Sequence, residues 1–168
     1  MTQRQRDKPK ILSPDYLVGL TDGEGCFYIN IRYEVKNRTK RPSVEHHFYI
    51  KLRGDSLPLI EKVKLAFGCG AIYLQKEKRE NHSECYRYEI NSRKDVQETL
   101  IPFFDKHQLQ SPKIKDYLLF RKAAMMIRDK EYLTKKGMKK FEEIKKKMNL
   151  GVRRVWKIRL LGGNAKKR

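Results

Sequence analysis

The sequence has 168 residues and a formal net charge of +20, from 40 Lys and Arg against 20 Asp and Glu. This length fits one domain with a real core, and a content of 39% hydrophobic residues excludes the composition of a disordered chain. No apolar run approaches the roughly 20 residues that span a bilayer, and the polar start lacks the apolar core of a secretory signal. Because excess positive charge is best compensated by a polyanion, nucleic acid is the expected partner, and a membrane surface fits less well.

The three cysteines (Cys26, Cys69 and Cys85) are scattered and odd in number. This pattern indicates a reducing, intracellular compartment without a disulfide framework. It leaves mitochondrion, plastid and bacterial or archaeal cytoplasm equally open.

The elements begin with a helix at Ser13, a predicted N-cap followed by Pro14, which Gly23 and Gly25 end. Alternation predicts strands over 26–35 and 45–53, joined by a basic turn over 36–43, and a second hairpin from strands over 71–78 and 85–91. Helical spacing predicts helices over 56–68, 94–105, 112–130 and 134–149. The expected core positions on the strands are Phe27, Ile29, Ile31, Tyr33, Val35, Phe48, Ile50, Leu52, Ile72, Leu74, Tyr86, Tyr88 and Ile90.

This order predicts an α+β fold of the type helix, strand, strand, helix, strand, strand, helix, with an antiparallel sheet and extra C-terminal helices. We expect three regions: a polar basic arm over 1–12, a folded domain over 13–150 and a basic tail over 151–168. The tail contains seven Lys and Arg and no acid, which is typical of an arm that folds on a partner.

The outward positions of the predicted strands are basic, polar or aromatic. Such a ribbon fits the major groove of DNA, where Arg, Lys, Asn and Gln match base edges, although an ordinary solvated sheet face is the alternative reading. The DNA-binding candidates are Tyr28, Asn30, Arg32, His47, Tyr49, Lys51, Tyr73, Gln75 and Arg87, with Lys36, Arg38, Lys40 and Arg41 in or beside the turn for phosphate contacts. A zinc site at His82 and Cys85 is disfavoured, since no second ligand pair matches.

The stretch LVGLTDGEG, residues 17–25, ends an apolar helix with two acids, Asp22 and Glu24. The end of a helix is partly negative, so acids there require a nearby cation. Leu17, Gly19, Leu20, Asp22, Glu24 and Gly25 match the motif of the LAGLIDADG homing endonucleases, and Val18, Thr21 and Gly23 are variants. The chain also resembles single-motif members of this family in FFDKHQLQSPKIKDYLLF and YLTKKGMKKFEEIKKKMN.

The resemblance implies a homodimer in which two motif helices cross, with an interface at Leu17, Gly19, Leu20 and Gly23. Gly19 and Gly23 lie four residues apart on one face, and their lack of side chains favours close helix approach. The resemblance also implies Mg²⁺, with Mn²⁺ as a substitute, held by Glu24 and the Gly23 carbonyl. It assigns Arg53, at the end of the strand over 45–53, and Lys113, near the start of the helix over 112–130, to catalysis beside Glu24. It gives Asp22 a supporting hydrogen-bonding role.

The implied activity is a double-strand break in a long, near-palindromic DNA site by an intron-encoded enzyme. An intron RNA maturase and a non-catalytic nucleic-acid-binding repressor of the same fold are alternatives, because a basic, aromatic surface also suits RNA. A structural ribosomal protein is a further alternative that the motif disfavours.

Overall fold

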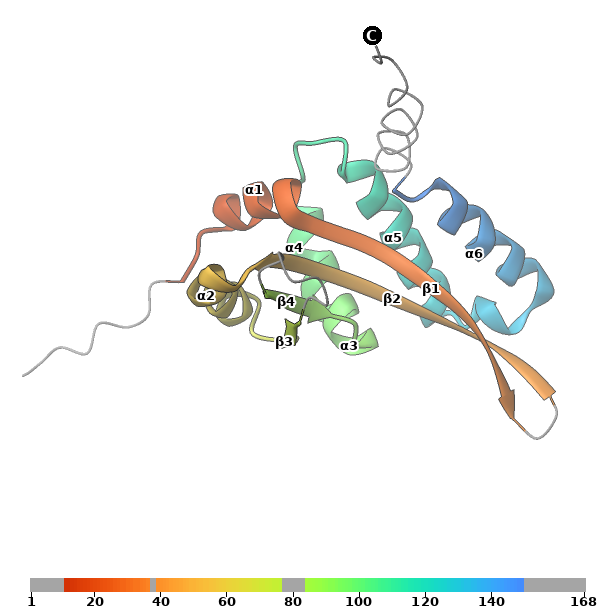
Figure 1. Cartoon of the computed structure of the whole chain (residues 1–168). Helices are drawn as coiled ribbons and strands as arrows, with labels where there is room; N and C mark the ends of the chain where they lie inside the picture. The colour runs from red at the N-terminus through yellow and green to blue at the C-terminus, as the bar shows by residue number, and fades with distance from the viewer. Residues whose placement is uncertain (1–10, 37–38, 77–83, 150–168) are drawn as a thin grey trace, which may run out of the picture. The chain divides into compact units, whose positions relative to one another are not determined.

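A computed structural model of the chain describes residues 11–36, 39–76 and 84–149 (Figure 1). Its helices are α1 (Pro14–Glu24), α2 (Leu57–Phe67), α3 (Arg93–Asp95), α4 (Ile101–Lys106), α5 (Ile114–Arg128) and α6 (Lys135–Lys147). Its strands are β1 (Gly25–Lys36), β2 (Thr39–Arg53), β3 (Ala71–Gln75) and β4 (Cys85–Ile90). Short helical turns cover Gly54–Ser56, Val96–Leu100 and Glu131–Leu133.

Two compact units make up the chain. The first unit combines Met1–Cys26 with His47–Lys113, and the second combines Phe27–His46 with Ile114–Arg168. The four strands form a sheet in the order β1-β2-β4-β3, and β4 pairs antiparallel with both β2 and β3. The predicted α+β class and the order of its elements are confirmed. The regional boundaries at residues 12 and 150 stay predictions, since the arm and the tail lie largely outside the described residues.

Helix α1 begins and ends where local chemistry predicts. The Ser13 hydroxyl accepts a hydrogen bond from the Tyr16 amide at 3.3 Å, and Pro14 occupies the first helical position. At the other end, Gly25 starts β1 directly, and a Cβ there would lie 2.6 Å from the Thr21 Cγ2 atom. Only glycine therefore permits so tight a change from helix to strand.

The first unit has an aromatic core. Phe48 of β2 packs edge to face with Phe67 of α2 at 6.1 Å and with Phe104 of α4 at 5.7 Å between ring centroids. Phe48 and Ile50 are fully buried, as predicted. The prediction of Leu74 as a core residue is wrong, because this side chain is 43% exposed on β3, the last strand of the sheet, which has a neighbour on only one side.

The second unit packs one face of its β1–β2 hairpin on helix α5. The Phe27 ring lies 5.5 Å from that of Tyr117 and 5.3 Å from that of Phe120. The prediction of Tyr33 as a core residue is wrong, since it is 53% exposed. The far end of the β1–β2 hairpin extends beyond α5 and α6 (Figure 1), so none of the described helices covers this part of β1.

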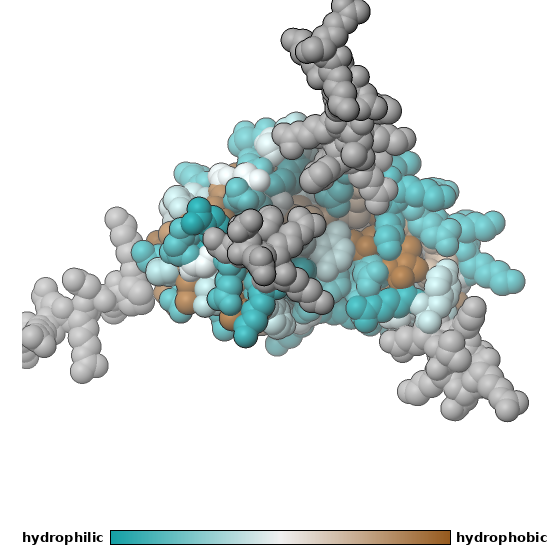
Figure 2. Space-filling view, in the orientation of Figure 1, coloured by the Kyte–Doolittle hydropathy of each residue, from teal (hydrophilic) through white to brown (hydrophobic). Residues whose placement is uncertain are grey.

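The C-terminal helices differ slightly from the predicted ranges. The helix predicted over 94–105 is present as α3 and α4 with a π-helical turn between them. Helix α5 begins at Ile114, so Lys113 precedes it rather than lying within it, which corrects the predicted position. None of the described helices has the length and hydropathy of a membrane span, and hydrophilic residues cover most of the coloured surface in Figure 2.

Candidate functional site

A cation from a distant part of the chain lies at the C-terminal end of α1, whose own last turn contains no basic residue. The Lys113 ammonium donates hydrogen bonds to the Thr21 carbonyl oxygen at 2.8 Å and to the Gly23 carbonyl oxygen at 3.4 Å. These carbonyls belong to the negative end of the helix dipole, which a positive charge stabilises. Lys113 therefore supplies one positive charge that the acid-ended helix requires, and it lies next to the carbonyl expected to bind metal.

Asp22 fixes the end of α1 to the segment before α5. Its carboxylate accepts hydrogen bonds from the Gln110 amide at 2.8 Å, the Ser111 amide at 3.2 Å and the Ser111 hydroxyl at 2.7 Å. This geometry is the supporting role expected for Asp22. Gln110 and Ser111 were not among the sequence candidates, because the order of residues does not reveal which distant loop meets the helix end.

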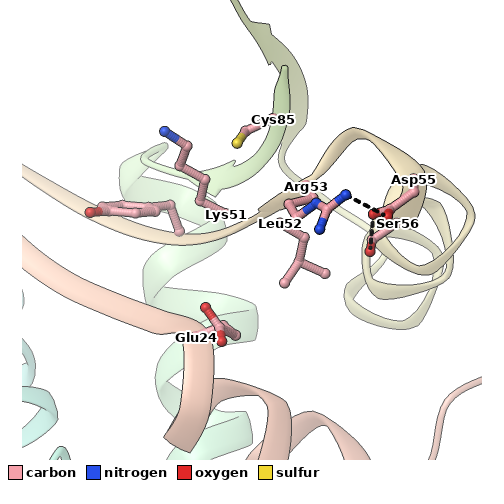
Figure 3. A pocket seen from close by; sticks show the side chains of 8 residues that line it. Glu24, Lys51, Leu52, Arg53, Asp55, Ser56 and Cys85 are labelled. Atoms are coloured by element: carbon pink, nitrogen blue, oxygen red, sulfur yellow. Dashed lines mark hydrogen bonds and ion pairs between the residues drawn. The ribbon is translucent and has the colours of Figure 1, made fainter. Parts of the chain in front are cut away.

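Glu24 differs from Asp22, although the two acids are only two residues apart. It is exposed and makes no hydrogen bond or ion pair with any residue that the structure describes. It borders a pocket of about 520 Å³ whose other lining residues are Tyr49, Lys51, Leu52, Arg53, Asp55, Ser56 and Cys85. Figure 3 shows Glu24 extending from α1 toward this space while Arg53 turns to Asp55.

The structure brings Glu24 and Arg53 to one pocket, and Lys113 to the carbonyl next to Glu24. Arg53 forms an ion pair with Asp55 at 3.4 Å, with both side chains well exposed. Asp55 and Ser56 were missed in the sequence, although they directly follow the strand that ends at Arg53. The catalytic assignment of Arg53 and Lys113 stays a prediction.

The oxygen donors at this helix end suit a hard divalent ion. A carboxylate and a backbone carbonyl are ligand types that Mg²⁺ prefers. The described residues contain no cluster of three or more His, Cys, Asp and Glu side chains that could hold a metal. One chain thus offers Glu24 and the Gly23 carbonyl, which fit part of a magnesium site.

One face of α1 is open. Gly19 and Gly23 are exposed, and a Cβ built on either meets nothing within 4 Å. Leu20 is half-buried on the same face, and Tyr16 joins it with 47% exposure. Leu17 does not belong to this face, which corrects the prediction: it is 3% exposed, because positions 17, 18 and 21 turn into the core. The spacing 16, 19, 20, 23 was the available signal for Tyr16.

Strand pairing in the first unit places the predicted DNA-binding residues in rows. Lys51 of β2, Arg87 of β4 and Tyr73 of β3 lie directly opposite one another, and Arg53, Cys85 and Gln75 form the next row. Paired residues share a sheet face, so His47, Tyr49, Lys51, Tyr73, Gln75 and Arg87 lie on one face, as predicted. Glu89, opposite Tyr49, shares this face and was missed, although it lies two residues from Arg87.

The second unit holds the other strand candidates. The Glu45 carboxylate accepts a hydrogen bond from the side-chain Nδ2 atom of Asn30 at 3.4 Å and forms an ion pair with Arg32 at 3.2 Å. Tyr28 lies on β1 with Asn30 and Arg32, and it is half-buried. Arg38 lies outside the described residues, and so do the side chains of Lys36, Lys40 and Arg41.

The fold and this helix end define a class of protein: an α+β chain whose first helix carries an exposed acid to the edge of a basic antiparallel sheet. A family model described as LAGLIDADG endonuclease matches residues 17–124. The chain belongs to this family.

Individual relatives and solved structures that resemble this chain are also named as endonucleases. A protein named probable intron-encoded endonuclease 2 of Neurospora crassa is 31% identical over 131 residues, which cover 78% of this chain and 26% of the relative. The crystal structure of the LAGLIDADG homing endonuclease I-LtrWI bound to target DNA has a TM-score of 0.76 and 29% identity, covering 88% of this chain and 48% of that one. The homing endonuclease I-TnaI has a TM-score of 0.71 and 32% identity, covering 83% and 90%. The chain spans about a quarter of the length of the curated relatives it matches.

Proposed function

We propose that this chain is a site-specific endonuclease that cuts both strands of a DNA target with a divalent metal ion, Mg²⁺ above all. The observation that carries the proposal is the exposed Glu24 beside Arg53, at a helix end stabilised by Lys113. The basic and aromatic face of β2, β4 and β3 is the proposed DNA-binding surface. Relatives named as endonucleases, and I-LtrWI with its bound target DNA, support the same activity.

In this proposal each residue has a distinct role. Glu24 and the Gly23 carbonyl would hold the metal, which when bound supplies an activated water and stabilises the leaving oxygen of the phosphodiester. Arg53 would stabilise the negative charge that develops on the phosphate, since a guanidinium donates several hydrogen bonds to phosphate oxygens. Lys113 would hold the Gly23 carbonyl in place, and Asp22 would hold the helix end.

The proposal requires two copies of this fold. One chain provides a single exposed carboxylate at the helix end, and two cuts on opposite strands need two such ends. The open glycine face of α1 is where a second α1 would pack, so we propose a homodimer on a near-palindromic site.

The test is cleavage of a randomised DNA library by the wild type and by Glu24→Gln, each with magnesium and with chelator. Glu24→Gln keeps the size of the side chain but removes the charge that binds metal. We expect cutting to fall at least about a hundredfold, with DNA affinity retained. Glu143→Gln, at an exposed position of α6, makes the same charge change far along the chain and should cut like the wild type.

Metal-independent cutting, or equal cutting by Glu24→Gln, would contradict the metal role. Tight binding to DNA without any cutting would favour the repressor alternative. Tight binding to structured intron RNA without cutting would favour the maturase alternative.

A further inference from the structure

Within the first unit, the DNA-binding face proposed for β2, β4 and β3 contains a single acid among its described strand residues, Glu89. One carboxylate oxygen lies 2.5 Å from the His47 Nδ1 atom, and the other lies 3.1 Å from the Arg87 Nε atom. The Arg87 guanidinium carbon lies 3.9 Å from the centre of the Tyr49 ring. We call these four side chains the Glu89 bridge.

The Glu89 bridge is much less exposed than an ordinary surface ion pair. The side chains of Glu89, His47 and Arg87 are 11%, 13% and 18% exposed. A carboxylate removed from water to this extent is costly unless it is paired and hydrogen-bonded. An acid on this face also repels DNA phosphates, so overall DNA affinity gives no reason for it.

Pairing with Glu89 restricts how Arg87 can meet a base. An arginine normally loses much rotamer freedom on binding, and here the ion pair and the Tyr49 ring fix it beforehand. A carboxylate only accepts hydrogen bonds, so Nδ1 of His47 must carry the proton. The other ring nitrogen of His47, Nε2, is buried, so His47 holds Glu89 in place instead of presenting a group to DNA.

The fixed Arg87 side chain matches chemistry in the major groove. The terminal amino groups of arginine are donors of the kind that recognise guanine O6 and N7. Lys51 lies directly opposite Arg87 and suits a phosphate contact.

We propose that Glu89, itself held by His47, is a positioning residue that sets base preference by fixing Arg87 before DNA binds. The inference rests on the proposed DNA-binding function of this face. It assigns specificity to an acid that makes no base contact of its own.

The second unit contains a more exposed version of the same arrangement. Glu45 joins Asn30 and Arg32, but its side chain is 34% exposed and that of Arg32 is 57% exposed. Solvent weakens such a pair and leaves the arginine more freedom. Replacing Glu45 should therefore change base preference less than replacing Glu89.

The experiment measures binding of the full chain to its selected DNA site, to every single-base variant of that site and to random-sequence DNA. Glu89→Gln should reduce discrimination about tenfold at one or two base pairs, as expected for one well-placed contact. Its affinity for random DNA should equal or exceed that of the wild type, because a negative charge is gone. The control Glu61→Gln removes an equal charge from an exposed position of α2 and should keep the wild-type preference.

Arg87→Ala should lose discrimination at the same base pair, and Glu89→Gln should add little to it, since both changes remove one interaction. If Glu89→Gln does not fold, Glu89→Asp keeps the charge but is too short to reach both partners, and it should lose the same preference. Unchanged discrimination, or an equal loss of affinity for all sequences, overturns the positioning role. A wild type without any base preference overturns the proposed function together with this inference. If the wild type is selective and Glu89→Gln is equally selective, the inference alone is overturned.

Discussion

Tyr88 shows how one residue links burial to the pH dependence of stability. It is fully buried, and its hydroxyl donates a hydrogen bond to the Cys69 carbonyl at 2.9 Å. Burial, and then the nearby Cys69 thiol, raise the pKa of Tyr88 above its ordinary value of 10.0. Tyrosine in the unfolded chain ionises near pH 10 while folded Tyr88 stays neutral, so its contribution to stability is complete below pH 10 and falls as the pH rises further.

Tyr88→Phe should lower the free energy of unfolding by about 1 kcal/mol at pH 7, because the Cys69 carbonyl loses its donor. Above pH 10 this difference should shrink by up to about 1.4 kcal/mol per pH unit, since only the wild type gains from ionising this tyrosine when unfolded. Urea denaturation of both proteins between pH 7 and pH 11 measures the change. A difference that stays constant across this range would mean that Tyr88 ionises equally in both states.

Residues whose role depends on local chemistry could be predicted from the sequence, and those whose role depends on distant partners could not. Ser13 as a cap needs only its neighbours, and the place of Glu24 at the end of α1 follows from the nine-residue motif, while its metal role stays a prediction. Glu89 depends on β2 pairing with β4 in one register, which brings it to His47 from 42 positions away. Leu17 was assigned to the wrong face because the motif gives residue types without saying which side of the helix meets the core.

At the scale of elements, the contact between α1 and the segment before α5 keeps the candidate site in place. Asp22→Ala would leave the Gln110 and Ser111 amides and the Ser111 hydroxyl without their acceptor. We expect a loss of about 1–3 kcal/mol in the free energy of unfolding, measured with urea. Asp22→Asn keeps one acceptor oxygen and should recover part of this loss, and a change below about 0.5 kcal/mol in both variants would rule out a supporting role.

The elements themselves were largely predictable, because hydrophobic periodicity and glycine or proline punctuation are local signals. The exceptions have structural causes. Leu74 alternates like a core residue but lies on the sheet edge, and Tyr33 continues the pattern of β1 past the helices that cover its start. Periodicity reveals which residues share a face, but the extent of the covering layer decides where burial stops.

At the scale of the whole molecule, the open face of α1 predicts the state of assembly. Gly19→Leu should disrupt the proposed dimer, because a large side chain prevents close approach of two helices. The separated chain should become more stable by up to about 1 kcal/mol, since leucine is a better helix former and Gly19 has nothing within 4 Å to clash with. Analytical ultracentrifugation gives the mass, and thermal melting gives the stability.

Gly19→Ala is the matched control, with a smaller side chain and a similar gain in helix propensity. It should weaken the dimer less than Gly19→Leu. A wild type that sediments as a monomer at micromolar concentration would contradict the proposed assembly.

The rows of side chains across β2, β4 and β3 affect how this surface could acquire a new target. Lys51, Arg87 and Tyr73 are far apart in the sequence but directly opposite one another in the sheet. Side chains in contact have non-additive effects, so the value of a substitution at one of them depends on the other two. Natural variation and laboratory libraries should therefore succeed more often when they exchange whole rows together than when they vary one strand at a time.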